Sequence, residues 1–339
     1  MVRVNYYVKR VIRSFVTLVL VISITFGLTR LMPGGPVDYM RAKLRKQNPD
    51  MPAEQVDQLV QAYVGVKPDE PIYVQYWNYV TNVLQGDLGE STYYNEPVAQ
   101  IYAEAIPWTL FVLGTAMLVT FAIAISLGAL LAYKEGSRFD SAISTIAIVL
   151  NSVPYYVAAI ILIAVFVTNL GMYPLSGRTS LGVTPGFNIP YILDLLRHAT
   201  LPMLSVIVTG FGVQTLAMRS NSIRILGEDY IRVARLRMLP TSRIANQYVA
   251  RNAILPIYTG FVIQIGFIFG GSIILEDIFR YPGVGFYFFD AIAARDYPLM
   301  MGGFLIISVA VVIAVSVADL TYGLIDPRAG AGGDQSEAY

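Results

Sequence analysis

The sequence predicts an all-α, polytopic membrane protein with six transmembrane helices. Three observations carry this prediction. The 339 residues are 55% hydrophobic and only 14% charged, whereas ordinary soluble domains have about 25% charged residues. The mean hydropathy is +0.56. Several apolar runs approach or exceed the roughly 20 residues that a helix needs to cross a hydrocarbon core, and arginine and lysine gather between these runs.

The expected spans are, in order, Ser14–Thr29, Ala105–Tyr133, Ser141–Leu170, Ala199–Met218, Asn252–Leu275 and Tyr297–Ala318. The second and third contain no charged residue. The first has the basic start and apolar run of a signal peptide, but no small-x-small cleavage site follows it, so we expect it to remain as a helix.

These spans give a domain plan with three parts. Residues 1–104 hold the first transmembrane helix and an extracytoplasmic helical region. Residues 105–325 form a five-helix core with a cytoplasmic loop at 219–256. Residues 326–339 form a Gly-rich polar tail, which we expect to be disordered.

Basic residues set the expected orientation in the membrane. They cluster at the start of the chain, between spans two and three, and between spans four and five. This alternation puts those segments and both termini in the cytoplasm, and residues 33–104 outside.

Two stretches of that outer region have helical spacing of their apolar residues, which predicts two short amphipathic helices. The apolar residues are Val56, Leu59, Val60 and Tyr63 in the first stretch, and Tyr76, Tyr79, Val80 and Val83 in the second.

The segment "EDYIRVARLRMLPTSRIANQYVARNAILP", Glu228–Pro256, is the most informative part of the chain. Topology and anionic lipid headgroups are enough to explain its arginines, but not its pattern. A first helix-compatible stretch reaches Pro240, which suits the first turn of a new helix, and a second stretch follows. Two short helices meeting at a bend, with the small Ala234 in the first, suit docking into a groove of another protein.

The same segment resembles the cytoplasmic coupling loop of permease subunits in ABC importers. The dipeptide/oligopeptide branch of that family reads D-Y-[IV]-R-x-A-R-A-K-G-L, followed by R-N-A-[LI]-x-P. The resemblance extends along nearly the whole chain, in order, through "PGGPVDYM", "GDLGES", "NSVPYYV", "LGMYPLSG", "LRHATLP", "ILEDIFRYPGVGFYFFDAIAARDYP" and "DPR". It implies the fold of a type I ABC importer permease, with the coupling residues Asp229, Tyr230, Arg232, Ala234, Arg235, Arg237, Met238 and Leu239.

Two departures from the family pattern matter. Met238 stands where the family has glycine, and Tyr248 where it often has histidine. A left-handed turn at a helix end costs a residue other than glycine about 1–2 kcal/mol. Either Met238 adopts that turn at this cost, or Pro240 redirects the chain with ordinary dihedral angles.

The resemblance also implies the partners. They are a second homologous permease subunit, two cytoplasmic ABC ATPase subunits that hold ATP and Mg²⁺, and an extracytoplasmic substrate-binding protein. The chain has no G-x-x-x-x-G-K-[ST] motif, so we expect no ATP site and no enzymatic activity on it. The net charge of +1 does not favour nucleic acid as a partner. With no cysteine and one histidine, no metal site is expected.

Polar residues inside spans mark candidate positions on the translocation path. Asn151, Gln214 and Gln264 qualify, although hydrogen bonding between helices is the favoured explanation for each. Pro154 and Pro202 are candidate kinks. A secondary transporter or channel that works without an ATPase remains the alternative. Related permeases carry peptides, nickel or sugars, and the sequence does not choose among them.

Overall fold

A computed structural model describes residues 2–31, 36–64, 70–240, 243–268 and 272–325. Within these ranges the regular elements are helices, and one isolated antiparallel bridge pairs Glu90 with Pro97. The chain divides into two compact units. The first comprises residues 1–109, 269–273 and 282–339, and the second comprises residues 110–268 and 274–281. The predicted all-α class is confirmed.

By length and composition, the described residues hold four helices that can cross a membrane, or five if a bent pair counts as one span. The six predicted spans are therefore not confirmed. The four are Val11–Leu28, Val98–Tyr133, Ile189–Leu226 and Tyr297–Ser316. The expected span Asn252–Leu275 coincides with α12 (Arg251–Ile268) as far as residue 268, and residues 269–271 lie outside the described part of the chain.

The third expected span is broken. It consists of α7 (Arg138–Asn151) followed by α8 (Tyr155–Leu162) and the π-helical η2 (Ile163–Asn169), and the two halves meet at 93°. Pro154 precedes α8 directly. Proline has no N–H to donate and disfavours the α conformation in the residue before it, so the helix ends here. Pro202 behaves differently, because α9 (Ile189–Leu226) continues through it.

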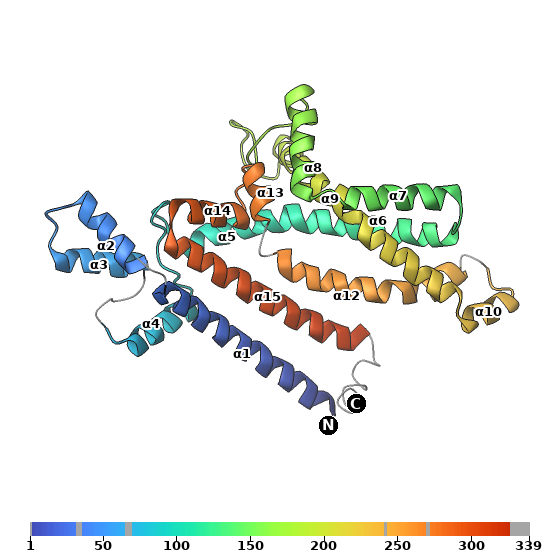
Figure 1. Cartoon of the computed structure of the whole chain (residues 1–339), viewed down its shortest axis with the longest axis horizontal. Coiled ribbons are helices and arrows are strands. Elements are labelled where there is room, and N and C mark those ends of the chain that lie inside the picture. Colours follow the sequence, from blue (N-terminus) through green and yellow to red (C-terminus); the bar gives the residue numbers. More distant parts are fainter. Residues whose placement is uncertain (1, 32–35, 65–69, 241–242, 269–271, 326–339) are drawn as a thin grey trace. The chain divides into compact units, whose positions relative to one another are not determined.

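In the first unit, α1 (Val2–Leu31) lies beside α15 (Tyr297–Ile325), as Figure 1 shows. The hydroxyls of Ser14 and Ser316 are 2.6 Å apart across this contact. The first and last expected spans therefore pack together.

Three short helices follow α1: α2 (Pro36–Gln47), α3 (Ala53–Val64) and α4 (Ile72–Leu84). The two predicted amphipathic helices correspond to α3 and α4, and α2 was not predicted. The apolar stripe of α3 packs on α2, where Val56 and Val60 are buried. On α4, Tyr76 and Tyr79 pack against Phe26 of α1. Burial raises the pKa of Tyr79 to about 12.

The loop after α4 is fastened to the start of α15 by the buried Asp296. Its carboxylate accepts hydrogen bonds from Ser91 Oγ at 2.5 Å and from the Tyr93 N–H at 3.0 Å, and it caps α15 through the Leu299 N–H. The "GDLGES" and "RDYP" motifs therefore meet in space. The remaining helices of this unit, α5 (Val98–Thr109) and α14 (Val284–Ala294), pack beside α15.

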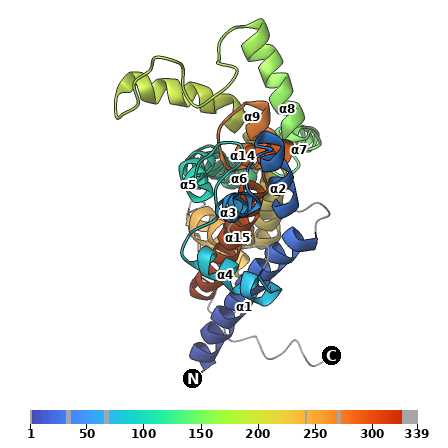
Figure 2. The ribbon, with the colours of Figure 1, turned by 90° about the vertical axis from the view of Figure 1, so that its left-hand side faces the viewer.

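The second unit begins with the π-helical η1 (Leu110–Gly114) and α6 (Thr115–Tyr133), and α6, α7 and α9 lie side by side in it (Figure 1). A Cβ built on Gly128 of α6 would lie 2.6 Å from the Cβ of Met218, and one on Gly212 of α9 would collide with the Ala147 carbonyl of α7. These glycines therefore let the three helices approach closely. In Figure 2, α8 and the N-terminal part of α9 project from this bundle in different directions.

Candidate functional site

The arginine-rich loop begins at the end of α9 and contains α10 (Asp229–Leu236) and the π-helical η3 (Ile244–Ala250), which leads into α12. The predicted first helix of the loop is thus confirmed. One face of α10 is buried, since Ile231 and Ala234 join an apolar cluster supplied by α9, α10, η3 and α12. We call this the coupling cluster; its buried members are Met218, Ile225, Ile231, Ala234, Ile244, Val249, Ala253 and Ile257. The cluster fixes α10 to the ends of two long helices.

The opposite face of α10 is exposed and is more apolar than a water-facing helix requires. Tyr230, Val233 and Leu236 recur at a spacing of three residues, and Leu236 is 76% exposed. The side chains around them are charged and also exposed: Asp229, Arg232, Arg235 and Arg237. We call this surface the α10 face. An exposed apolar strip with a basic border is typical of a protein-binding surface.

The end of α10 is a Schellman turn, in which the residue after the C-cap has left-handed dihedral angles. Met238 holds that position with φ +53°. The two expected hydrogen bonds are present, from the Met238 N–H to the Arg235 carbonyl at 2.9 Å and from the Leu239 N–H to the Ala234 carbonyl at 3.3 Å. Of the two possibilities that the sequence left open, the structure has the first: Met238 makes the bend itself. Its side chain is 90% exposed.

Ala234 has a different place from the one expected. It is 3% exposed and packs inside the coupling cluster, so its methyl group contacts this chain's own side chains. Ile231 and Ala234 lie three residues apart on the helix and therefore share the inner face. The other seven residues that the resemblance assigns to coupling are partly or fully exposed. These seven side chains are accessible from outside this chain, whereas Ala234 packs against the coupling cluster on the inner face of α10.

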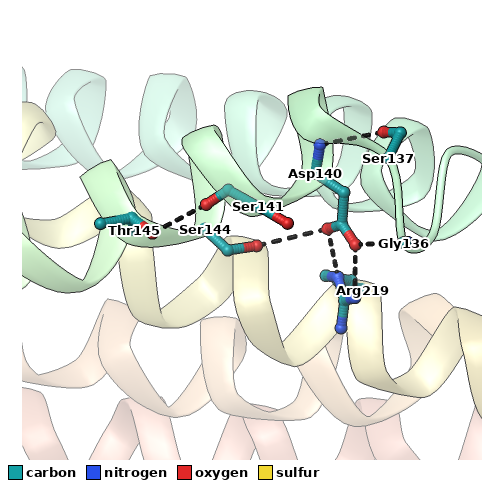
Figure 3. Close-up of polar contacts among 7 residues, drawn as sticks. All are labelled: Gly136, Ser137, Asp140, Ser141, Ser144, Thr145 and Arg219. Atoms are coloured by element: carbon teal, nitrogen blue, oxygen red, sulfur yellow. Dashed lines mark hydrogen bonds and ion pairs between the residues drawn. The ribbon is translucent and has the colours of Figure 1, made fainter.

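A bidentate ion pair joins the start of α7 to the C-terminal half of α9 (Figure 3). Arg219 donates from Nε and Nη2 to the two carboxylate oxygens of Asp140, each at 2.6 Å. Asp140 is 3% exposed and also accepts from the Gly136 N–H and Ser144 Oγ. Ser137 caps the same helix by accepting from the Asp140 N–H. The pair therefore fixes the turn between α6 and α7 to α9. On α9, Arg219 directly follows Met218, which belongs to the coupling cluster.

A cavity of about 280 Å³ lies between α6, α9 and α12. Its lining is apolar except for three uncharged polar residues, one from each helix: Thr120, Gln214 and Gln264. Two of the three residues that the sequence suggested for the path therefore meet in one cavity. Asn151 does not line it and is exposed at the end of α7. Whether any of the three lies on a translocation path stays a prediction.

Phe121 and Phe261 line this cavity on α6 and α12 and stack on each other. Phe121 also packs against the coupling cluster. The cavity and the arginine-rich loop are therefore connected through contacting side chains within one unit of the chain. Among the described residues, no group of three or more His, Cys, Asp or Glu side chains could hold a metal ion.

Sequence reasoning missed Asp140, Thr120 and the stacked rings. For Asp140 a signal was available, since "SRFD" before an apolar run has the S-x-x-D form of a helix start. Its partner Arg219 lies 79 positions along the chain, and the sequence contains no sign of that pairing. Thr120 and the two phenylalanines are ordinary members of apolar runs, so only the packing of the helices distinguishes them.

Comparison with known proteins gives matches over nearly the whole chain. Residues 124–330 match the family described as "Binding-protein-dependent transport system inner membrane component", and residues 1–112 match the corresponding N-terminal family. The di/tripeptide transport system permease protein DppB of Pseudomonas aeruginosa is 35% identical over 318 residues, covering 90% of this chain and 92% of that protein.

Two further relatives align over similar lengths. The oligopeptide transport system permease protein AppB of Bacillus subtilis is 31% identical, covering 95% of this chain and 98% of that protein. The glutathione transport system permease protein GsiC of Salmonella choleraesuis is 30% identical, with the same coverage. With its multi-pass helical architecture, this chain belongs to the family of inner membrane permease components of binding-protein-dependent transport systems.

Proposed function

We propose that this chain is the permease subunit of an ATP-driven importer of peptides, and that the α10 face is where it docks with cytoplasmic ATPase subunits. The observation that carries the proposal is the two-sided arrangement of α10. Its inner face is held in the coupling cluster, and its outer face offers Tyr230, Val233 and Leu236 within a basic border. A helix that is fixed to α9 and α12 can transmit a push from a partner to the helices around the cavity.

The arginines supply the polar part of the same surface. Arg232, Arg235 and Arg237 are exposed and suit ATPase carboxylates, which guanidinium groups bind in bidentate geometry. Coupling requires that the ATPases contact this face differently in their ATP-bound and ATP-free states, since only differential contact shifts a conformational equilibrium.

The partners follow from the family and from the relatives' names. They are a second homologous permease, two ATPases that bind ATP and Mg²⁺, and an extracytoplasmic binding protein that delivers the substrate. Peptides are the proposed substrate, because DppB and AppB are named as di/tripeptide and oligopeptide permeases. The cavity with Gln214 and Gln264 is proposed as part of the translocation path. Both termini are proposed to be cytoplasmic.

Reconstitution of the four kinds of subunit in proteoliposomes tests the proposal. We expect peptide uptake that requires ATP, and we expect Val233→Glu to abolish both uptake and copurification of the ATPases. Arg138→Ala is the control, because Arg138 is exposed at the start of α7 and is not part of the α10 face. Uptake without ATP or without the ATPases would instead favour a secondary transporter or channel.

A further inference from the structure

Among the described residues, the lining of the cavity between α6, α9 and α12 includes three uncharged polar side chains and no charged one. Thr120 carries a hydroxyl, and Gln214 and Gln264 each carry an amide; the other lining residues in this part of the chain are apolar or glycine. Its volume, about 280 Å³, is near the lower end of the range for small-molecule sites, about 300–1,000 Å³. It therefore has room for a short part of an extended substrate.

The hydroxyl of Thr120 is buried and has no hydrogen-bond partner among the described residues. Thr215 of α9 shares this property, whereas three other threonines in helices are paired within their own helices. Thr25, Thr145 and Thr200 each donate to the carbonyl four residues earlier. Because buried hydroxyls are normally paired, Thr120 keeps an unused hydrogen-bonding group in the wall of the cavity.

The chemistry of the three groups fits one class of ligand group. A glutamine side chain both donates and accepts, and a hydroxyl does the same, so together they complement an amide that offers an N–H and a carbonyl. No carboxylate, guanidinium or ammonium of the described residues lines the cavity, so it offers no opposite charge to a peptide's charged side chains or to a metal cation. The main-chain amide is the group that all peptides share.

We infer that Thr120, Gln214 and Gln264 bind main-chain amide groups of peptides in transit, so that the permease itself selects for the amide link and is indifferent to side-chain charge. This inference rests on the proposed function and adds to it a selective step outside the binding protein. It predicts discrimination between a peptide and the depsipeptide in which an ester oxygen replaces one amide N–H.

The experiment is ATP-driven uptake by the reconstituted complex, measured with a tripeptide and with its depsipeptide. Three variants each remove one polar group and keep the size of the side chain: Thr120→Val, Gln214→Met and Gln264→Met. Thr145→Val is the matched control, because Thr145 is exposed on α7 and its hydroxyl is bonded within its own helix. The binding protein is the same throughout, so a change in the amide-to-ester uptake ratio originates in this subunit.

We expect the parent to transport the tripeptide faster, and each cavity variant to lower the amide-to-ester ratio by about two- to tenfold, the effect of one hydrogen bond. Thr145→Val should leave the ratio unchanged. The inference is overturned if the parent does not discriminate, or if the variants slow both substrates equally, as a purely structural role would do. If the parent complex shows no ATP-driven peptide uptake at all, the proposed function fails and this inference fails with it.

Discussion

Phe121 and Phe261 stack with their ring centroids 4.2 Å apart and their planes inclined by 29°. The pair borders the cavity, and Phe121 packs against the coupling cluster. It is thus the place where a movement of α10 can reach the cavity through side chains in contact. Offset stacking of this kind contributes about 0.5–1.5 kcal/mol beyond the burial of its area, which is enough to bias a conformational equilibrium by roughly tenfold.

We expect Phe261→Ala to weaken the link between the coupling cluster and the cavity. Uptake per ATP hydrolysed should fall several-fold while the subunits still copurify, because Phe261 lies outside the cluster itself. Phe261→Leu should have a smaller effect, since it keeps apolar volume. Phe166→Ala is the control, because it removes one ring of an edge-to-face pair with Tyr173, away from the cavity. Equal coupling ratios in the parent and Phe261→Ala would contradict this role.

Met238→Gly should stabilise the protein by about 1 kcal/mol, because glycine adopts the left-handed turn without the Cβ strain that Met238 carries. The measurement is the apparent melting temperature of the purified chain in detergent. Pro240→Ala should change it little, since the Schellman turn already ends α10 before residue 240. A lower melting temperature for Met238→Gly would mean that the methionine side chain contributes more than its backbone costs.

The sequence was sufficient for the helical class, the position of α10 and the two helices α3 and α4, because each depends on local periodicity. It also located the bend after α10. What it missed depends on contacts between distant segments. Ala234 looks like a small docking residue in the sequence, but tertiary packing turns it inward beside Ile231. The break at Pro154 was suggested by the residue type, whereas its 93° angle was not.

Asp140→Asn should destabilise the protein by about 3–5 kcal/mol, since it leaves the Arg219 guanidinium without its carboxylate. Arg219→Lys should also destabilise it, because lysine keeps the charge but cannot form the bidentate contact. The double variant Asp140→Asn/Arg219→Gln should lose less than the sum of its two single changes, and the melting temperature in detergent measures it beside Asp140→Asn, Arg219→Gln and Arg219→Lys. Additive effects of Asp140→Asn and Arg219→Gln would show that the residues do not act as a pair.

Ala234→Glu and Leu236→Glu should both abolish ATP-driven uptake, but for different reasons. The first puts a carboxylate into the coupling cluster and should lower the yield of folded protein, because a buried charge without a partner is strongly unfavourable. The second changes an exposed side chain and should leave the free energy of unfolding within about 0.5 kcal/mol of the parent value, while the ATPases no longer copurify. If Ala234→Glu folds normally and only loses the ATPases, Ala234 contacts the partner after all.

The proposed orientation predicts which side of the membrane each exposed segment faces. The chain contains no cysteine, so a single introduced cysteine reports its own position when intact cells are treated with a membrane-impermeant thiol reagent. Gln58 on α3 and Gln247 on η3 are both exposed. We expect Gln58→Cys to react from outside, because the alternation of basic clusters puts the region after α1 there. Gln247→Cys should react only after the cells are permeabilised. Permeabilisation is also the control that both thiols are reactive.

Labelling of Gln247→Cys but not Gln58→Cys in intact cells would show the opposite topology. The α10 face would then lie on the side of the membrane that holds no ATP.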